Sequence, residues 1–125
     1  MRKGADISIQ AGKCGTALAA AAFGSEVEIV ELLLSKGADI SIQAGEWGTA
    51  LAAAAYGGEA EIVELLLSKG ADINAKGGRY GTPLGAALNS DYEGSDDVIE
   101  LLLSKGADTE LLNEEDKAKV QEYLR

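Results

Sequence analysis

The nine residues Glu-Leu-Leu-Leu-Ser-Lys-Gly-Ala-Asp occur three times in this chain of 125 residues, at 31–39, 64–72 and 100–108. The first two copies start 33 residues apart, and the third starts 36 residues after the second. A fixed period between about 20 and 50 residues is the signature of a solenoid, in which each unit buries its apolar face only against its neighbours. The repeat therefore predicts an array of three units, the third of which carries an insertion of three residues.

The units that contain these segments are close copies of one another. The first two agree at 28 of 33 positions, and the third is a looser copy. Because chance does not produce such agreement, we expect a single repeat domain over 1–125. Its predicted parts are the remainder of a preceding unit at 1–6, units at 7–39, 40–72 and 73–108, and a capping segment at 109–125.

Each unit reads as a protruding, hairpin-like loop followed by two helices, so the predicted fold class is all-α. In the first unit the Ala-rich stretch 17–23 predicts a short helix, and Thr16 is placed to cap its first turn. Ser25 and Glu28 have the spacing of a capping box, which predicts a second helix over 26–35.

The second helix of each unit is predicted to be amphipathic and to end at a left-handed glycine, which is Gly37 in the first unit. Its apolar face in that unit consists of Val27, Ile29, Val30, Leu33 and Leu34. The acidic residues of these helices are Glu26, Glu28, Glu31, Glu59, Glu61, Glu64, Asp97 and Glu100. We interpret them as a solvated outer face, and the alternative is a surface that attracts a basic partner.

The segment after the third unit departs from the repeat. Asn113, followed by three acidic residues, is expected to begin a last helix that runs to Leu124. Val120, Tyr123 and Leu124 are expected to face inward, and the polar remainder of the helix suits an element that covers the end of the array.

Composition removes most enzyme classes. The chain has no His, one Cys, 11 basic and 21 acidic residues, and a net charge of −10. Without His there is no Ser–His or Cys–His catalysis and no imidazole metal site, and the negative charge disfavours nucleic acid and anionic membranes as partners. A single Cys favours a reducing compartment, and no apolar run is long enough to cross a bilayer. We expect a cytoplasmic protein that is not an enzyme and needs no cofactor or metal.

A unit of this length with Gly-Thr-x-Leu-x-x-Ala-Ala, an Ile-Val-x-Leu-Leu-Leu core and a closing Gly-Ala-Asp resembles the ankyrin repeat. Gly-Thr-Pro-Leu at 81–84 is closest to the family's Thr-Pro-Leu-His. Ala19, Ala52 and Gly85 occupy the His position, so the hydrogen bonds that this His supplies between loop and helix must be absent or replaced. The near-identical units and Tyr-Gly-x-x-Leu at 80–84 look most like the ankyrin arrays of fungal immune-type receptors. The resemblance implies a curved solenoid that binds a protein partner through its finger loops and first helices.

The first two units show where the sequence is free to differ. They differ at Lys13/Glu46, Cys14/Trp47, Phe23/Tyr56, Ser25/Gly58 and Val27/Ala60. Three of these pairs map to the finger tip and the end of the first helix, which the resemblance implies is the partner-contacting side. With the third unit included, the predicted partner-binding residues are Lys13, Cys14, Phe23, Glu46, Trp47, Tyr56, Arg79, Tyr80 and Asn89. Trp, Tyr and Arg are enriched in binding hot spots; the alternative interpretation is drift at exposed positions, with rings packing over neighbouring loops.

Cys14 has a second possible role as a reactive thiol. A lowered thiol pKa would need a nearby cation, and Lys13 is adjacent only in sequence. We favour a small unreactive side chain at this position.

The insertion gives the third unit a lengthened segment between its helices. Over 89–100 it places oxygen-bearing side chains at the first, third, fifth and ninth positions, Gly at the sixth and Glu at the twelfth, as in an EF-hand calcium loop. Against this reading, Asn89 replaces the leading Asp, and Ser95 with the acidic residues after it is explained by capping of the next helix. A lengthened turn is therefore the favoured interpretation and a calcium-responsive loop a minor alternative.

The leading hypothesis is a protein-interaction module, and the second is an engineered or structural array without a natural ligand. No helix precedes Gly4, so the first unit is expected to expose apolar surface suited to a neighbour, which allows self-association through this face. The identity of the partner does not follow from these residues.

Overall fold

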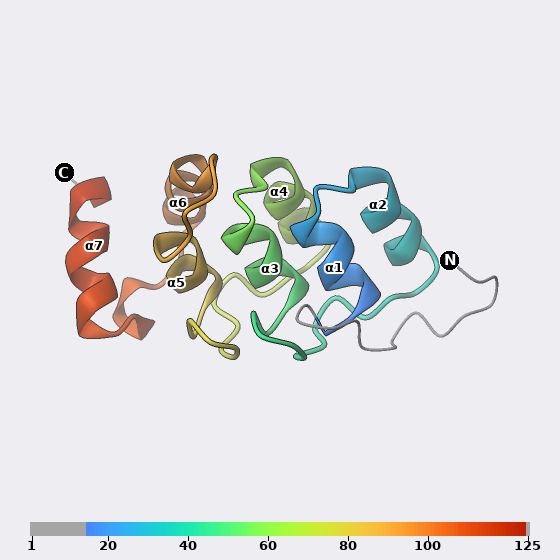
Figure 1. Ribbon diagram of the computed structural model, residues 1–125, viewed down its shortest axis with the longest axis horizontal. Coiled ribbons are helices and arrows are strands. Elements are labelled where there is room, and N and C mark those ends of the chain that lie inside the picture. The colour runs from blue at the N-terminus through green and yellow to red at the C-terminus, as the bar shows by residue number, and fades with distance from the viewer. Residues whose placement is uncertain (1–14, 125) are drawn as a thin grey trace.

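The computed structural model describes residues 15–124, which form an elongated array of helix pairs (Figure 1). Helices α1, α3 and α5 form one row and α2, α4 and α6 a second row, with the connecting loops along one edge and α7 at the C-terminal end. Within this part of the chain the elements are α1 (Ala17–Phe23), α2 (Val27–Ser35), α3 (Ala50–Tyr56), α4 (Ala60–Ser68), α5 (Pro83–Leu88), α6 (Ser95–Ser104), the 3₁₀ turn η2 (Thr109–Leu111) and α7 (Glu114–Leu124). The predicted all-α solenoid is confirmed, and none of the described helices is long and apolar enough to cross a membrane.

The first helix of each unit begins at a buried threonine, as predicted for Thr16. The hydroxyl oxygen of Thr16 accepts a hydrogen bond from the Ala19 amide at 3.0 Å, and Thr49 and Thr82 cap α3 and α5 in the same way. A capping hydroxyl satisfies an amide that the helix itself leaves without an acceptor, and typically contributes about 1 kcal/mol.

The predicted capping box at the start of the second helix is wrong. Ser25 makes no cap for α2; it is the left-handed residue that ends α1, with φ of 65°, and the Glu26 amide donates to the Ala21 carbonyl at 3.0 Å. The turn between the two helices is so short that this position belongs to the end of the first helix. The second unit places Gly58 here, also with positive φ, whereas in the third unit the insertion separates the equivalent Gly94 from α5, so that Gly94 directly precedes α6. Ser95 likewise caps nothing, because it is already the first residue of α6.

The second helices end as predicted. Gly37 has φ of 95°, its amide donates to the Leu34 carbonyl, and the Ala38 amide donates to the Leu33 carbonyl at 3.0 Å. Gly70 and Gly106 repeat this arrangement in the other two units.

Burial of the second-helix face depends on position in the array. Ile62 and Val98 are 1% and 0% exposed, whereas Ile29, at the equivalent place in α2, is 44% exposed. The apolar face predicted for the first unit is therefore correct for Val30 and Leu33, which are buried, but wrong for Ile29. Ile62 and Val98 have a preceding helix pair to pack against, and among the described residues Ile29 has none.

Helix α7 covers the C-terminal end of the array. Its start is as predicted, because the Asn113 side chain accepts a hydrogen bond from the Asp116 amide at 2.7 Å. Val120 is fully buried, but the prediction for Leu124 is wrong, since this side chain is 51% exposed at the last turn. The polar residue that faces inward is Asp116, which is 2% exposed.

Candidate partner-binding surface

Aromatic side chains from successive units lie together on one side of α3. Phe23 ends α1, Tyr56 ends α3, and Trp47 and Tyr80 precede α3 and α5 in the finger loops. Their rings are nearly parallel: the Trp47 and Tyr56 centroids are 4.2 Å apart, those of Tyr56 and Tyr80 are 5.5 Å apart, and those of Phe23 and Trp47 are 6.0 Å apart. The sequence predicts these residues at two separate places, the finger tips and the ends of the first helices, and the structure brings both groups into one stack.

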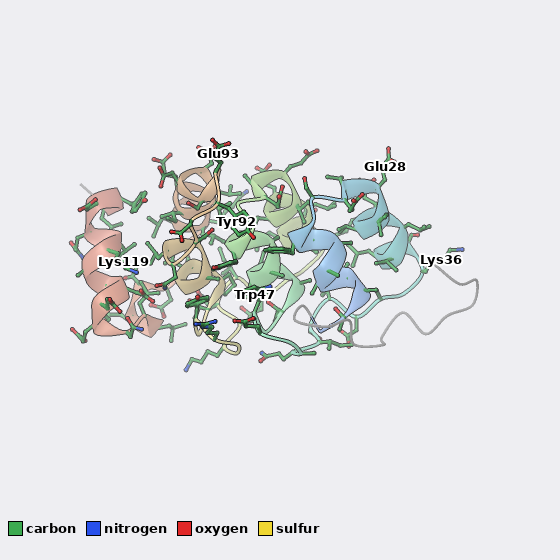
Figure 2. All side chains as sticks on the ribbon, in the orientation of Figure 1. Glu28, Lys36, Trp47, Tyr92, Glu93 and Lys119 are labelled. Atoms are coloured by element: carbon green, nitrogen blue, oxygen red, sulfur yellow. The ribbon has the colours of Figure 1, made fainter. Side chains whose placement is uncertain are left out.

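A fifth ring, that of Tyr92, comes from the insertion of the third unit and was not among the predicted site residues. Tyr92 is labelled in Figure 2. Its ring meets those of Phe23 edge-on at 5.5 Å and Tyr56 at 5.8 Å between centroids, and the residue is 50% exposed. The Ser90 hydroxyl anchors the same turn by donating to the Tyr56 carbonyl. We call Phe23, Trp47, Tyr56, Tyr80 and Tyr92 the aromatic row. The sequence signal that could have identified Tyr92 is an aromatic residue in the insertion, in a chain that has only six aromatic residues.

Trp47 lies in the middle of the aromatic row and is 8% exposed. Phe23, Tyr56 and Tyr80 stack around it. Its indole Nε1 is buried without a hydrogen-bond acceptor in the part of the chain that the structure describes. Trp47 therefore supports the other rings from within, and the accessible part of the row is formed by its neighbours.

Glu46 and Arg79 join neighbouring finger loops. The Arg79 guanidinium donates to the Glu46 carboxylate at 2.5 Å, and the Arg79 amide donates to the Glu46 carbonyl at 2.7 Å. The hydrogen bond with Glu46 raises the pKa of Arg79, and its guanidinium carbon lies 5.5 Å from the centre of the Tyr80 ring. Two predicted site residues thus form an ion pair beside the aromatic row.

The Tyr56 hydroxyl lies near negative charge at the polar edge of the aromatic row. Burial raises the pKa of the Tyr56 hydroxyl above its usual value, and the neighbouring Tyr80 and the Asp91 carboxylate raise it further. Each of these effects disfavours a second negative charge at the same place. The Tyr56 phenol therefore stays protonated at neutral pH.

Asn89 is held by contacts within the chain. Its amide nitrogen donates to the Gly85 carbonyl at 2.8 Å and to the Asp116 carboxylate at 3.0 Å, and Lys119 donates to its amide oxygen at 2.8 Å. Asn89 thus ties α5 to the capping helix α7. These bonds leave little of its hydrogen-bonding capacity for a partner.

The calcium-loop alternative does not fit the geometry. Residues 95–100, half of the twelve-residue pattern, lie in α6, so their side chains diverge around a helix. The side chain of Asn89, at the first position, is bonded to Asp116 and Lys119. Over 15–124 no group of three or more acidic, Cys or His side chains is placed to hold a metal ion.

The acidic second-helix residues lie on the outer side of the array, as predicted. Glu28, Glu31, Glu61, Glu64, Asp97 and Glu100 are all exposed. They are on the row of helices that carries neither Trp47 nor the first-helix ends.

Lys13 and Cys14, the two remaining predicted site residues, lie outside the described residues. At Gly85, one of the three positions where the family has His, a Cβ would lie well inside 3.0 Å of the Tyr80 carbonyl oxygen, so the close approach of the backbones there requires glycine.

The family model described as ankyrin repeats (3 copies) matches residues 1–77 and 17–113. The chain therefore belongs to the ankyrin repeat family, whose members are generally protein–protein interaction modules. A search of curated proteins gives no match to this chain.

Proposed function

We propose that this chain is a non-enzymatic module that binds a protein partner through the aromatic row and the finger loops beside it. The observation that carries the proposal is the meeting of rings from three units on one face, with Tyr92 half exposed at its edge. Rings present a large, rigid contact area at a low entropic cost, and Tyr and Arg are enriched among residues that dominate binding energy.

The proposed contact residues are Phe23, Tyr56, Arg79, Tyr80 and Tyr92, with Trp47 and Glu46 as their support. Lys13 and Cys14 belong to the same finger positions in sequence and stay part of the proposal. Asn89 is the predicted residue with the weakest support, because its side chain is engaged with α7.

The experiment is affinity capture from a lysate with the intact chain and with Tyr92→Ala and Arg79→Ala. Both side chains are largely exposed, so the variants should fold. We expect each to reduce capture of a specific protein at least about tenfold, the loss typical of a hot-spot residue. Glu28→Ala on the outer helix α2 is the matched control, and capture that is equal for all four proteins would refute the proposed surface.

A structural array without a natural ligand is the second candidate. The observation that favours it is the burial of Trp47 among parallel rings of adjacent units, since such packing stabilises the array whether or not anything binds. On this view Tyr92→Ala and Arg79→Ala change stability and abolish no interaction. Thermal unfolding of the same variants, measured beside the capture experiment, distinguishes the two.

We also propose self-association through the N-terminal face of the first unit, to which α2 contributes. Ile29 and Leu32 are 44% and 46% exposed, whereas Ile62 is covered by the preceding unit. A second copy could cover this face. Sedimentation equilibrium tests it: a strict monomer at high concentration, or an association that Leu32→Lys leaves unchanged, rules it out.

The single cysteine supports placing the module in a reducing compartment such as the cytoplasm.

A further inference from the structure

The charged side chains around the aromatic row are not all paired with an opposite charge. Arg79, the basic side chain at the row, is paired with Glu46, so these two groups cancel. Asp91 and Glu93 flank Tyr92 in sequence, are exposed, and have no salt bridge among the described residues. The accessible end of the row therefore combines an exposed ring with the Asp91 carboxylate, which acts on the Tyr56 hydroxyl, and with no cation paired to it among the described residues.

Ring faces attract cations because the π electrons make the face of an aromatic ring negative. The chain itself uses this attraction at the finger end of the row, where the Arg79 guanidinium lies near the Tyr80 ring. At the other end, Tyr92 and Tyr56 are without such a cation among the described residues. A planar guanidinium can stack on a ring and bond to a carboxylate at the same time, which an ammonium group does less well.

We propose that the Tyr56–Tyr92 end of the aromatic row binds an arginine side chain of the partner, so that the partner segment is basic. This inference rests on the proposed function and names the chemistry of its partner. The guanidinium would stack against the exposed Tyr92 ring, with the Asp91 carboxylate as its counter-ion. The Tyr56 ring would contact the aliphatic part of the partner side chain.

The probe is a synthetic peptide that alternates Gly and Arg, compared with one in which citrulline replaces Arg. Citrulline keeps the planar shape and loses the charge, so the pair isolates the charge of the side chain. Trp47 is the only tryptophan of the chain and lies within the row, so its fluorescence reports binding directly. At physiological ionic strength we expect the Arg peptide to bind at least about fivefold more tightly than the citrulline peptide.

Non-specific attraction is the main competing explanation, because the chain carries a net charge of −10. The matched variants are Asp91→Asn at the row and Glu61→Gln on the outer helix row, each of which removes one negative charge. Charges further away than about 8 Å are largely screened at physiological salt. We therefore expect Asp91→Asn to weaken binding about threefold and Glu61→Gln to leave it unchanged. Tyr92→Ala should weaken it by a similar factor through loss of the ring.

The outcomes separate this inference from the proposed function. Equal losses in Asp91→Asn and Glu61→Gln would show attraction by net charge alone and overturn the inference. A citrulline peptide that binds as well as the Arg peptide, with loss in Tyr92→Ala, would overturn the basic chemistry and leave the surface standing. If no peptide responds to Tyr92→Ala and capture of a protein is also unchanged, both proposals are wrong.

Discussion

The left-handed residue after the first helix is Ser25 in the first unit and Gly58 in the second, and exchanging serine and glycine at these two positions should change the stability of the chain in opposite directions. Ser25 is the only residue other than glycine with a positive φ among the described residues. A left-handed conformation costs an L-residue about 1–2 kcal/mol, whereas glycine loses about 0.5–1 kcal/mol more backbone entropy on folding. Ser25→Gly should therefore stabilise the chain by about 0.5–1 kcal/mol, which raises the Tm by about 2–4 °C for a domain of this size.

Gly58→Ser, the reverse change in the second unit, should destabilise the chain by more than Ser25→Gly stabilises it. Gly58 has φ of 73°, and a Cβ on it would lie well inside 3.0 Å of the Glu93 carbonyl oxygen in the inserted turn of the third unit. The backbone of that turn must move to admit a side chain, and overpacking of this kind costs about 1–3 kcal/mol. With the conformational cost added, Gly58→Ser should destabilise the chain by about 2–4 kcal/mol.

The control is Gly70→Ser, which has the same conformational cost without the contact. Gly70 has φ of 100°, and no atom lies within 4 Å of the position that its Cβ would take. Urea denaturation followed by circular dichroism measures all three variants, with the slope of the transition checked for loss of two-state behaviour. If Gly58→Ser costs no more than Gly70→Ser, the inserted turn does not press on the second unit and the reasoning is refuted.

Three further changes test the caps and the last helix. Thr49→Ala removes the hydroxyl that accepts from the Ala52 amide and should cost about 1–2 kcal/mol in urea denaturation, and Thr49→Ser should restore most of it. Asp116→Ala removes the acceptor of the Asn89 amide from a buried site and should cost about 2–3 kcal/mol in thermal unfolding. The hydrogen bond to Asp96 raises the pKa of Tyr123 from 10.0 to about 12, so its contribution is complete below pH 10 and is lost as the pH rises from 10 to 12. Because this pair is exposed, we expect only about 1 kcal/mol, and Tyr123→Phe should flatten that part of the stability profile measured against pH.

The periodic features of the fold could be predicted from the sequence because they depend on neighbours along the chain. Thr16 caps the amide three residues later, and Gly37 ends a helix that stops beside it. The capping box at Ser25 fits the same kind of local pattern and is nevertheless wrong. The residue lies between two helices, and the pattern does not say which helix end it serves. Its conformation is set by the closing bonds of α1.

The candidate site could be predicted only in part because it depends on contacts between units. Comparison of the repeats identified Trp47 and Tyr56 as variable, but it could not show that their rings stack 4.2 Å apart. It did not identify Tyr92, whose ring reaches the row only because of the path of the inserted turn. Asn89 was predicted at a helix end, and its engagement with Asp116 depends on how α7 folds back.

The contacts between units also explain why two nearly identical units differ where they do. Four of the five residues by which the second unit departs from the first lie against the third unit: Glu46 pairs with Arg79, Trp47 and Tyr56 stack with Tyr80, and Gly58 packs on the turn at Glu93. Tyr56 and Gly58 meet the inserted turn, through Ser90, Tyr92 and Glu93, whereas Glu46 and Trp47 contact the finger loop of the third unit at Arg79 and Tyr80. The inserted turn completes the aromatic row, because Tyr92 meets Phe23 and Tyr56. The proposed function therefore places the partner at the junction between the second and third units, and an array built only from copies of the first unit would lack the surface.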